Sequence, residues 1–497
     1  MTGQPDGGPT LSGLPGFCRV IGSIHPEPGS DIRFEVWLPT EGWTGRLMGA
    51  GNGGLAGSIS YSDLASAVRV GQVGASTDTG HSGNPLDSSW AKGHPERVRD
   101  YGWRGIHLTT VIAKQLAQHF YGHAPDRSYF VGCSNGGRMG LMEASRFPDD
   151  YDGILAGAPA SSATRLIMTL IWVAQAQMAT GAAIRPEQVK LLQSEVLAQC
   201  DALDGRTDGL VTDPRQCAFD AMKLACGTNS SPQCFTPPQL HALKKIHDGP
   251  IDHAGRQIVF GFSATGSEGG VPAPFFGWDG SIAKGAQKGP IQSAFPDVLM
   301  NLPPQPIARD EEFDFNRDPA QVKATLSPEI DPQPNLQRFF ARGGKLIMWH
   351  GWADATIPPQ YSLSFHQQIL ASSGPKAKTQ MRLFMVPGVQ HCFGGPGPDL
   401  FGQIGAPPMD DTPDRNIATA LVDWVEMGRT PQTLVGRLGI AGMTGMPATG
   451  PEKQRLICAY PATAVLSPGG DPDMASSYQC NVRTSIARRG GSGNGAL

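Results

Sequence analysis

The stretch that decides the fold is Tyr129-Phe130-Val131-Gly132-Cys133-Ser134-Asn135-Gly136-Gly137-Arg138. Its apolar first half predicts a short strand, and the residues after Ser134 predict a helix. The turn between them has the form Gly-x-Ser-x-Gly, which is the pattern of a nucleophile elbow. Such a sharp turn needs small residues beside the serine, and Gly132 and Gly136 supply them. Gly-rich turns also join strands to helices in other α/β folds, so residues further along the chain must decide between the two interpretations.

Strands and helices alternate on both sides of this elbow. Strands are expected at residues 33–38, 43–50, 71–76, 151–158, 345–349 and 381–386. Helices are expected at 104–121, at 139–147, and where Ile417, Leu421, Trp424 and Val425 share one face. This alternation predicts an α/β fold with a mostly parallel sheet, and the elbow identifies it as an α/β-hydrolase core.

The pattern changes between residues 162 and 335, where helical segments at 186–203 and 237–247 stand among cysteines and Gly-rich loops. We therefore expect a catalytic domain made of residues 1–161 and 336–497, with 162–335 inserted as a large lid. The alternative is an independent domain. The return of strands at residue 345 favours insertion, because the later strands must complete the interrupted sheet.

Composition excludes several classes of partner. The 497 residues carry a net charge of −4 and the pI is near 6.3, so nothing favours nucleic acid or an anionic membrane surface. No apolar run reaches the roughly 18 residues that span a bilayer. The first residues, 1–6, lack the basic and apolar regions of a signal peptide, so we expect that such a leader is absent or removed.

Nine cysteines are present and none forms a Cys-x-x-Cys pair, which disfavours zinc ribbons and thioredoxin-like sites. Close spacings suggest local disulfides within the groups Cys200 and Cys217, Cys226 and Cys234, and Cys458 and Cys480, although spacing leaves the connectivity open. An odd count leaves at least one free thiol, for which Cys18 is the first candidate. Disulfides require an oxidising compartment, so we expect a secreted or periplasmic protein.

Two polar residues after later strands complete a candidate catalytic triad with Ser134. Asp354 follows the strand at 345–349, and His391 follows the strand at 381–386. The order Ser, Asp, His is that of α/β-hydrolases, in which the acid orients the base and the base deprotonates the serine. Taken singly, Asp354 would be a turn aspartate and His391 a loop histidine. Their order and their positions after strands favour the triad.

Cys133 precedes the candidate nucleophile and Cys392 follows the candidate base. If Ser134 and His391 lie within hydrogen-bond reach, their neighbours are plausibly within disulfide reach, and we predict a Cys133–Cys392 bond. The alternative is two buried free thiols.

An oxyanion hole needs two preorganised N–H donors. Asn135, directly after the nucleophile, is expected to supply one. The second is expected from the turn Gly51-Asn52-Gly53-Gly54, with Gly53 as the preferred donor. A plain Gly-rich turn is the alternative, and the choice among the glycines is open.

Five segments resemble the tannase and feruloyl esterase family, which includes mono(hydroxyethyl) terephthalate hydrolase. They are Gly132-Cys133-Ser134-Asn135-Gly136-Gly137-Arg138, Phe147-Pro148-Asp149-Asp150-Tyr151-Asp152-Gly153, Ala156-Gly157-Ala158-Pro159, His350-Gly351-Trp352-Ala353-Asp354 and His391-Cys392-Phe393-Gly394-Gly395-Pro396-Gly397. The resemblance runs from about residue 18 to 480. It implies hydrolysis of aromatic-acid esters, a lid domain, secretion and a disulfide beside the triad.

The resemblance also implies the pairs Cys200–Cys217, Cys226–Cys234 and Cys458–Cys480. Family members often pair the N-terminal cysteine as well. No cysteine occurs near residues 50–70 here, so Cys18 is expected to be free.

The segment from Cys200 to Leu210 contains three aspartates between turns. Ca²⁺ prefers several oxygen ligands of this kind, although the spacing is not that of an EF-hand. The similar family segment is a structural calcium site, which implies as ligands the side chains of Asp201, Asp204 and Asp208 and the carbonyls of Arg206 and Leu210. The alternative is a pair of Asp-Gly turns held by a disulfide. No organic cofactor is expected.

The expected function is a serine carboxylic ester hydrolase of feruloyl esterase or tannase type, acting on a small aromatic ester through an acyl-enzyme. A terephthalate monoester hydrolase is the close alternative, since lid residues should set specificity. A non-catalytic binding protein and a peptidase on the same fold are further alternatives. Asp78 and His81 are expected to be scaffolding near the site.

Overall fold

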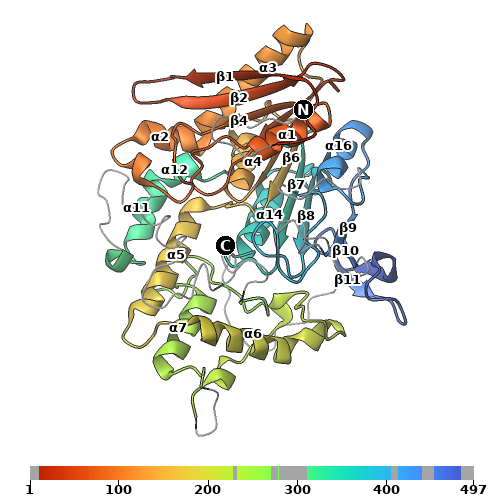
Figure 1. Cartoon of the computed structure of the whole chain (residues 1–497). Coiled ribbons are helices and arrows are strands. Elements are labelled where there is room, and N and C mark those ends of the chain that lie inside the picture. Colours follow the sequence, from red (N-terminus) through yellow and green to blue (C-terminus); the bar gives the residue numbers. More distant parts are fainter. Residues whose placement is uncertain are drawn as a thin grey trace.

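A mostly parallel sheet of eight strands forms the centre of the computed structural model, which describes residues 11–227, 232–269, 278, 310–403, 412–438 and 453–482 (Figure 1). In spatial order the strands are β1 (Phe17–Ile24), β2 (Ile32–Pro39), β4 (Val73–Thr77), β3 (Arg46–Ala50), β5 (Arg127–Cys133), β6 (Gly153–Gly157), β7 (Lys345–Gly351) and β8 (Met381–Val386). From β4 to β8 neighbours are parallel, whereas β1, β2 and β4 pair antiparallel at one edge. The expected α/β fold is confirmed.

Helices and short strands surround the sheet. The helices are α1 (Tyr61–Arg69), α2 (Pro95–Arg99), α3 (Gly105–Tyr121), α4 (Asn135–Arg146), α5 (Ala163–Met178), α6 (Pro186–Cys200), α7 (Pro237–Asp248), α11 (Asp318–Thr325), α12 (Ser327–Ile330), α13 (Gln337–Ala341), α14 (Gln360–Ser372), α15 (Ala377–Gln380) and α16 (Ile417–Met427), with a π-helical turn η2 (Asp100–Arg104) before α3. Two further strand pairs join β9 (Thr433–Arg437) to β10 (Gln454–Cys458) and β11 (Thr463–Leu466) to β12 (Tyr478–Asn481). Within the described ranges, no helix is both long and apolar enough for a bilayer.

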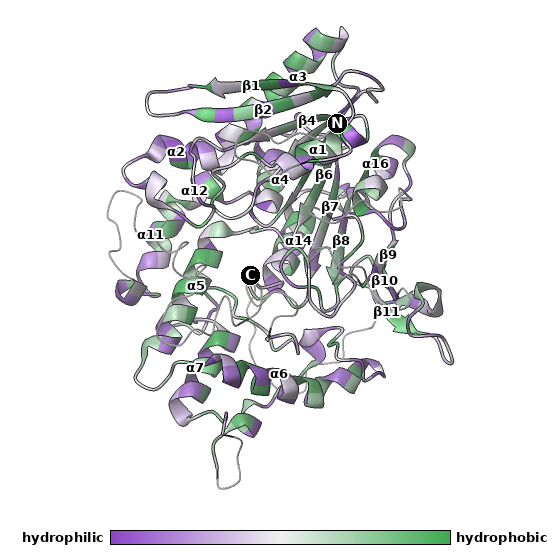
Figure 2. Cartoon of the chain, in the orientation of Figure 1, coloured by the Kyte–Doolittle hydropathy of each residue, from purple (hydrophilic) through white to green (hydrophobic). Residues whose placement is uncertain are grey.

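Successive side chains of the central strands enter two cores on opposite faces of the sheet. On β7, Leu346 and Met348 pack in a core with side chains of α3, α4 and α14. Ile347 and Trp349 pack in a second core with side chains of α16. This is the two-residue period of a strand, and burial of both faces explains why the strands are apolar throughout (Figure 2).

The chain leaves the sheet after β6 and returns to it at β7. These two strands pair directly in parallel, with Gly153 opposite Lys345 and Gly157 opposite Trp349. Between them, α5, α6 and α7 lie outside the sheet (Figure 1), and side chains of these helices form a core of their own around Val189, Leu192 and Phe235. The segment is therefore inserted between neighbouring strands. Parts of the predicted lid, residues 228–231, 270–277 and 279–309, lie outside the described residues.

Several elements differ from expectation. The strand expected at 43–50 begins only at Arg46, and the helix expected at 139–147 begins at Asn135, directly after the elbow serine. The edge strand β1 was not predicted, because its residues are half-buried and do not alternate clearly. Helix α5 was not predicted either. It is buried on most sides, so its apolar residues show no single face.

Candidate active site

Ser134 occupies a strained turn between β5 and α4. Its backbone has φ 63° and ψ −123°, a combination that residues other than glycine rarely adopt. The turn brings backbone segments together: a Cβ on Gly132 would lie 2.4 Å from the carbonyl carbon of Gly136, and a Cβ on Gly51 would lie 2.5 Å from the Cα of Gly136. Only glycine fits these positions, as expected for a nucleophile elbow.

The structure brings Ser134, His391 and Asp354 together. His391 Nε2 lies 2.8 Å from Ser134 Oγ, and His391 Nδ1 lies 2.7 Å from Asp354 Oδ2. Since a carboxylate only accepts hydrogen bonds, Nδ1 carries the proton toward Asp354 and Nε2 is left to accept from the serine hydroxyl. Asp354 and His391 follow β7 and β8, so the parallel strands place all three residues at one edge of the sheet.

Asp354 is fully buried and is held as a carboxylate. Its Oδ1 accepts the backbone N–H groups of Thr356 and Ile357, each at 2.8 Å. Burial alone would raise the pKa of Asp354, but the charge of His391 and hydrogen bonds from His350 and His391 hold that pKa well below its usual range. An ionised Asp354 can therefore orient His391 and stabilise its protonated form.

His350 was quoted in the family motif, but sequence reasoning assigned it no role. It is completely buried, with Nε2 3.1 Å from Asp354 Oδ2 and 3.0 Å from the carbonyl oxygen of Ile357. Its Nδ1 lies 2.7 Å from the hydroxyl of Ser362 on α14. His350 therefore donates to the same carboxylate oxygen as His391 and fixes its position. The only hint in the sequence that His350 contacts Asp354 is that the two residues are four positions apart.

The nucleophile and the base are joined through their neighbours. Cys133 and Cys392 form a disulfide with an S–S distance of 2.05 Å and a Cα–Cα distance of 6.0 Å. The structure also forms the pairs Cys200–Cys217, Cys226–Cys234 and Cys458–Cys480, and Cys18 is free.

The two expected oxyanion donors belong to segments that meet at the elbow, since the backbone of Gly51 and Asn52 packs against Gly136. Asn135 is the first residue of α4, and Gly53 lies in the turn after β3. Within the described part of the chain, neither backbone N–H has a hydrogen-bond acceptor. Both groups are thus available to a ligand. Of the same turn, Gly54 and Leu55 line the cavity beside Ser134.

A mainly apolar cavity opens beside Ser134. Helix α5 contributes apolar side chains to its wall, and further lining residues come from η2, α12 and the loop after β7; among them are Leu166, Ile167, Leu170, Ile330 and Ile357. The polar lining side chains include those of Tyr101, Asn135 and Thr356, and the buried Thr356 hydroxyl has no partner among the residues that the structure describes. Such a mainly apolar cavity suits a flat hydrophobic acyl group.

Asp78 and His81 support the cavity wall from behind. His81 Nε2 donates to the carbonyl oxygen of Leu55 at 2.8 Å, and the ring stacks on Trp90 with centroids 4.0 Å apart. Burial lowers the pKa of His81 to about 4, so the ring is neutral at physiological pH. Asp78 Oδ1 accepts the backbone N–H groups of Arg33 and Gly80. Neither residue reaches Ser134, in line with the expected scaffolding role.

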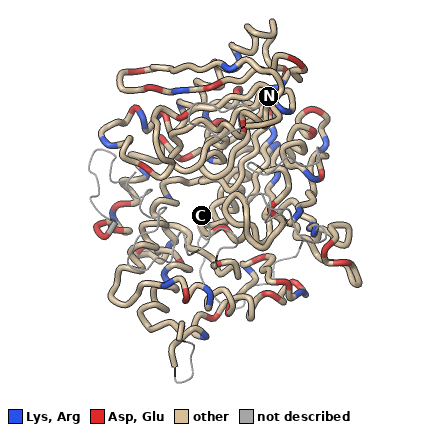
Figure 3. Tube along the Cα trace, in the orientation of Figure 1, with Lys and Arg blue, Asp and Glu red and all other residues tan. Residues whose placement is uncertain are grey.

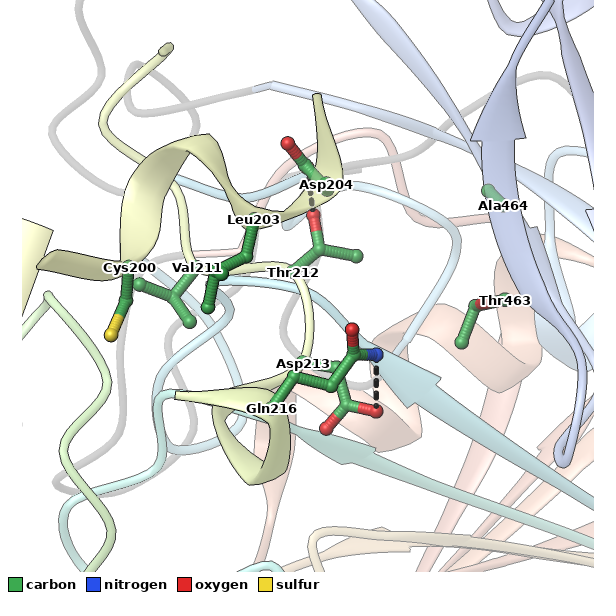
Figure 4. Close-up of a pocket in the computed structure, with 9 residues that line it drawn as sticks. All are labelled: Cys200, Leu203, Asp204, Val211, Thr212, Asp213, Gln216, Thr463 and Ala464. Carbon is green, nitrogen blue, oxygen red and sulfur yellow. Dashed lines mark hydrogen bonds between the residues drawn. The ribbon is translucent and has the colours of Figure 1, made fainter. Parts of the chain in front are cut away.

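In the candidate calcium loop the aspartates accept hydrogen bonds from the loop itself, and Figure 4 shows one of these contacts, between Asp204 and Thr212. Asp201 accepts the backbone N–H groups of Asp208, Gly209 and Leu210. Asp204 accepts the N–H of Arg206 and the Thr212 hydroxyl.

Asp208 pairs with the guanidinium groups of Arg206 and Arg455. Burial raises the pKa of Asp208. The charges of Arg206 and Arg455 lower this pKa, whereas the charges of Asp204 and Asp201 raise it. Half-buried negative charge is thus concentrated here, which suits a hard cation. The three carboxylates are nevertheless spread along the loop, and none is free of a protein donor.

A second acidic group lies between α4 and α3. His107, Glu143 and Asp150 form the only set of three or more such side chains, within the described residues, whose ligand atoms lie within 4.8 Å of one another. Asp150 Oδ2 already lies 2.6 Å from His107 Nδ1. Burial, followed by the charge of Asp150 and a hydrogen bond to it, raises the pKa of Glu143 well above its usual value. The raised pKa favours a protonated Glu143, whose proton can be shared with Asp150.

Known proteins resemble the whole chain. The family model described as tannase and feruloyl esterase matches residues 18–481. A probable feruloyl esterase B-2 of Aspergillus flavus is 35% identical over 434 residues, covering 84% of this chain and 80% of that protein. Mono(2-hydroxyethyl) terephthalate hydrolase of Piscinibacter sakaiensis is 30% identical over 536 residues, covering 95% and 86%. The crystal structure of feruloyl esterase B from Aspergillus oryzae has a TM-score of 0.83 at 26% identity, covering 94% of this chain and 91% of that one.

Proposed function

Because this chain belongs to the tannase and feruloyl esterase family and is a carboxylic ester hydrolase, we propose that it cleaves esters of aromatic acids with Ser134 as nucleophile, His391 as general base and Asp354 as the orienting acid. The observation that carries this proposal is the hydrogen-bonded line from Asp354 through His391 to Ser134, which ends at the mouth of an apolar cavity.

The geometry supports a two-step acyl transfer. Ser134 Oγ attacks the ester carbonyl carbon while its proton moves to His391 Nε2. The N–H groups of Asn135 and Gly53 stabilise the resulting oxyanion. The protonated His391 then passes its proton to the leaving alkoxide, and the alcohol departs from a Ser134 acyl ester. A water molecule, deprotonated by His391, repeats the attack and releases the acid.

The lining of the cavity favours a substrate whose aromatic acyl group carries no charge. Its described lining includes no Lys, Arg, Asp or Glu side chain, so a terephthalate monoester would bring an unpaired carboxylate against apolar walls. A feruloyl or galloyl group would instead present a ring and hydroxyl groups. Because the Piscinibacter relative is named a mono(2-hydroxyethyl) terephthalate hydrolase, a terephthalate monoester is the second candidate substrate.

Initial rates on methyl ferulate, methyl gallate and mono(2-hydroxyethyl) terephthalate test this proposal, with Ser134→Ala as the blank. We expect the two uncharged acyl groups to have the higher kcat/KM. Turnover of none of the three esters by the wild-type protein would reject aromatic-ester hydrolysis.

We further propose that residues 162–335 act as a lid that sets specificity. Helix α5 supports this role, since Leu166, Ile167 and Leu170 line the cavity beside Ser134. Four disulfides support a secreted or periplasmic location.

A structural calcium ion at the loop from residue 201 to 210 is a separate proposal. The side chains of Asp201, Asp204 and Asp208 and the carbonyls of Arg206 and Leu210 would hold it. The concentration of carboxylates supports this assignment, and binding would require Asp208 to exchange arginine contacts for the ion. The ion would stabilise the loop and would take no part in the chemistry.

A further inference from the structure

Arg138 belongs to the elbow stretch, and its side chain is completely buried although the steps above leave it without a role. Arginine is always charged in proteins, and a buried charge is costly unless it is paired or hydrogen-bonded. Among the described residues, no carboxylate forms an ion pair with Arg138. Its guanidinium is satisfied by neutral oxygens instead. A buried positive charge therefore lies one helical turn from the nucleophile, and Asp331 acts on it by its charge without forming an ion pair among the described residues.

Three of these oxygens are backbone carbonyls of η2 and α12. Arg138 Nη1 donates to the carbonyl oxygens of Gly102 at 2.9 Å and Ile330 at 3.1 Å, and Nη2 donates to that of Tyr101 at 3.0 Å. Gly102 and Tyr101 belong to η2, and Ile330 ends α12. Tyr101 and Ile330 both line the cavity beside Ser134. The Arg138 side chain thus joins its own helix, α4, to η2 and α12.

The fourth oxygen belongs to an expected oxyanion donor. Arg138 Nε donates to Oδ1 of Asn135 at 2.6 Å, and the Tyr101 hydroxyl donates to the same oxygen at 2.9 Å. The Tyr101 hydroxyl also lies 3.4 Å from the carbonyl oxygen of Gly54. Tyr101 therefore contacts both segments that hold the expected oxyanion donors, the residue after the nucleophile and the turn that contains Gly53.

We infer that Arg138 is a positioning residue that acts through Tyr101 and Asn135 to hold the two halves of the oxyanion hole in register and to place positive charge beside it. This inference rests on the proposed acyl transfer. A fixed charge in a buried site needs no reorganisation when the oxyanion forms, so it stabilises the transition state more than the bound ester. The Tyr101 ring covers the guanidinium with its centroid 4.6 Å from Cζ and excludes water from that face.

The test compares Arg138→Met, Arg138→Lys and Tyr101→Phe with Arg146→Met as the matched control. Arg146 lies near the end of the same helix and makes analogous contacts, with the carbonyl of Pro328 and the ring of Trp103, but it is exposed and remote from Asn135. With p-nitrophenyl acetate we expect kcat to fall about 10²-fold in Arg138→Met, the usual effect of a lost oxyanion donor. It should fall about tenfold in Arg138→Lys and Tyr101→Phe, and less than twofold in Arg146→Met.

Inhibitor binding separates positioning from a general loss of structure. Phenylboronic acid forms a tetrahedral adduct with the serine and resembles the transition state, whereas benzoate resembles the product. We expect the boronate inhibition constant to weaken in proportion to kcat/KM across the variants, and the benzoate constant to change less than threefold. Equal weakening of both, or wild-type kcat in Arg138→Lys and Tyr101→Phe, overturns the inference. If Arg138→Met does not fold, those two variants decide. Because p-nitrophenyl acetate carries no aromatic acyl group, failure of the aromatic-ester proposal would leave this test intact.

Discussion

The sulfur atoms of Cys133 and Cys392 are bonded, and the side chains of the residues beside them, Ser134 and His391, meet at 2.8 Å. The two cysteines are separated by 259 residues in the sequence. The covalent bond therefore fixes the distance between nucleophile and base across a segment that includes the proposed lid. Movement of that segment can change the cavity without separating the reacting groups.

The first prediction follows from this bond. The double variant Cys133→Ala/Cys392→Ala should lose stability, by up to about 5 kcal/mol in the chain-entropy model for so long a loop, and should lose kcat because Ser134 and His391 are no longer tied. Urea unfolding and methyl ferulate turnover measure the two effects. Cys226→Ala/Cys234→Ala is the matched control, since these two cysteines are only 8 residues apart in the sequence and neither is next to a residue of the triad. A clamp role is wrong if both double variants retain full kcat.

Asp354→Asn should reduce kcat by about 10⁴-fold while leaving the fold intact, because an amide can donate to His391 and favour the wrong tautomer. Single-turnover acylation by p-nitrophenyl acetate measures the loss directly. Acid stability should change as well. The pKa of Asp354 is lowered in the folded state, so its contribution is present above its unfolded value near 3.8 and disappears as the pH falls. The variant should therefore be less stable than the wild type at pH 6, and this difference in stability should shrink as the pH is lowered. Near-normal kcat in Asp354→Asn would contradict the assigned role.

Gly132→Ala should displace the elbow. The new Cβ would meet the backbone of Gly136 at 2.4 Å, which no side-chain movement can relieve. We expect a loss of about 1–3 kcal/mol in the free energy of unfolding and a large loss of activity, since Ser134 would shift. Gly83→Ala is the control, because a Cβ there has no atom within 4 Å. Equal activity in the two variants would show that the elbow tolerates a side chain.

The residues of the triad could be predicted because each follows a strand, and parallel strands end at a common edge. The sequence signal for Ser134, Asp354 and His391 is therefore local, although the site is not. Arg138 and Tyr101 could not be assigned in this way. Arg138 binds backbone carbonyls of η2 and α12, and no residue pattern marks a carbonyl as an acceptor. Tyr101 binds the Asn135 side chain and lies near the carbonyl of Gly54, which only the fold brings together.

The residues of the cavity wall could not be predicted from the sequence, for a different reason. Helix α5 is apolar on most sides, and its residues meet Ser134 only because the inserted segment returns over the sheet edge. Specificity therefore depends on long-range packing, whereas the chemistry depends on short motifs. The calcium loop is an intermediate case: its aspartates were evident, but their contacts with Arg455, from β10, were not.

Calcium removal tests that loop. If the ion is bound, chelation should lower the melting temperature and release about one equivalent of calcium, which elemental analysis of the purified protein measures. Activity below the melting temperature should persist, because none of the proposed ligands lines the cavity beside Ser134. Asp204→Asn should weaken binding more than Asp248→Asn, a control on the exposed end of α7. The proposal fails if the purified protein contains no calcium and chelation leaves the melting temperature unchanged.

Asp78 should make stability depend on pH near neutrality. Burial raises its pKa to about 7, and one carboxylate oxygen has no partner. Between pH 3.8 and 7 the folded protein holds a proton that the unfolded chain has released, so the free energy of unfolding falls as the pH rises through this window. Asp78→Asn removes that dependence, because its amide does not titrate. The melting temperature of the variant relative to wild type should therefore rise steadily from pH 4 to pH 7.5. Asp149→Asn, with a side chain that is 79% exposed, should show no such trend. A constant difference between Asp78→Asn and wild type would mean that Asp78 is ionised throughout this range.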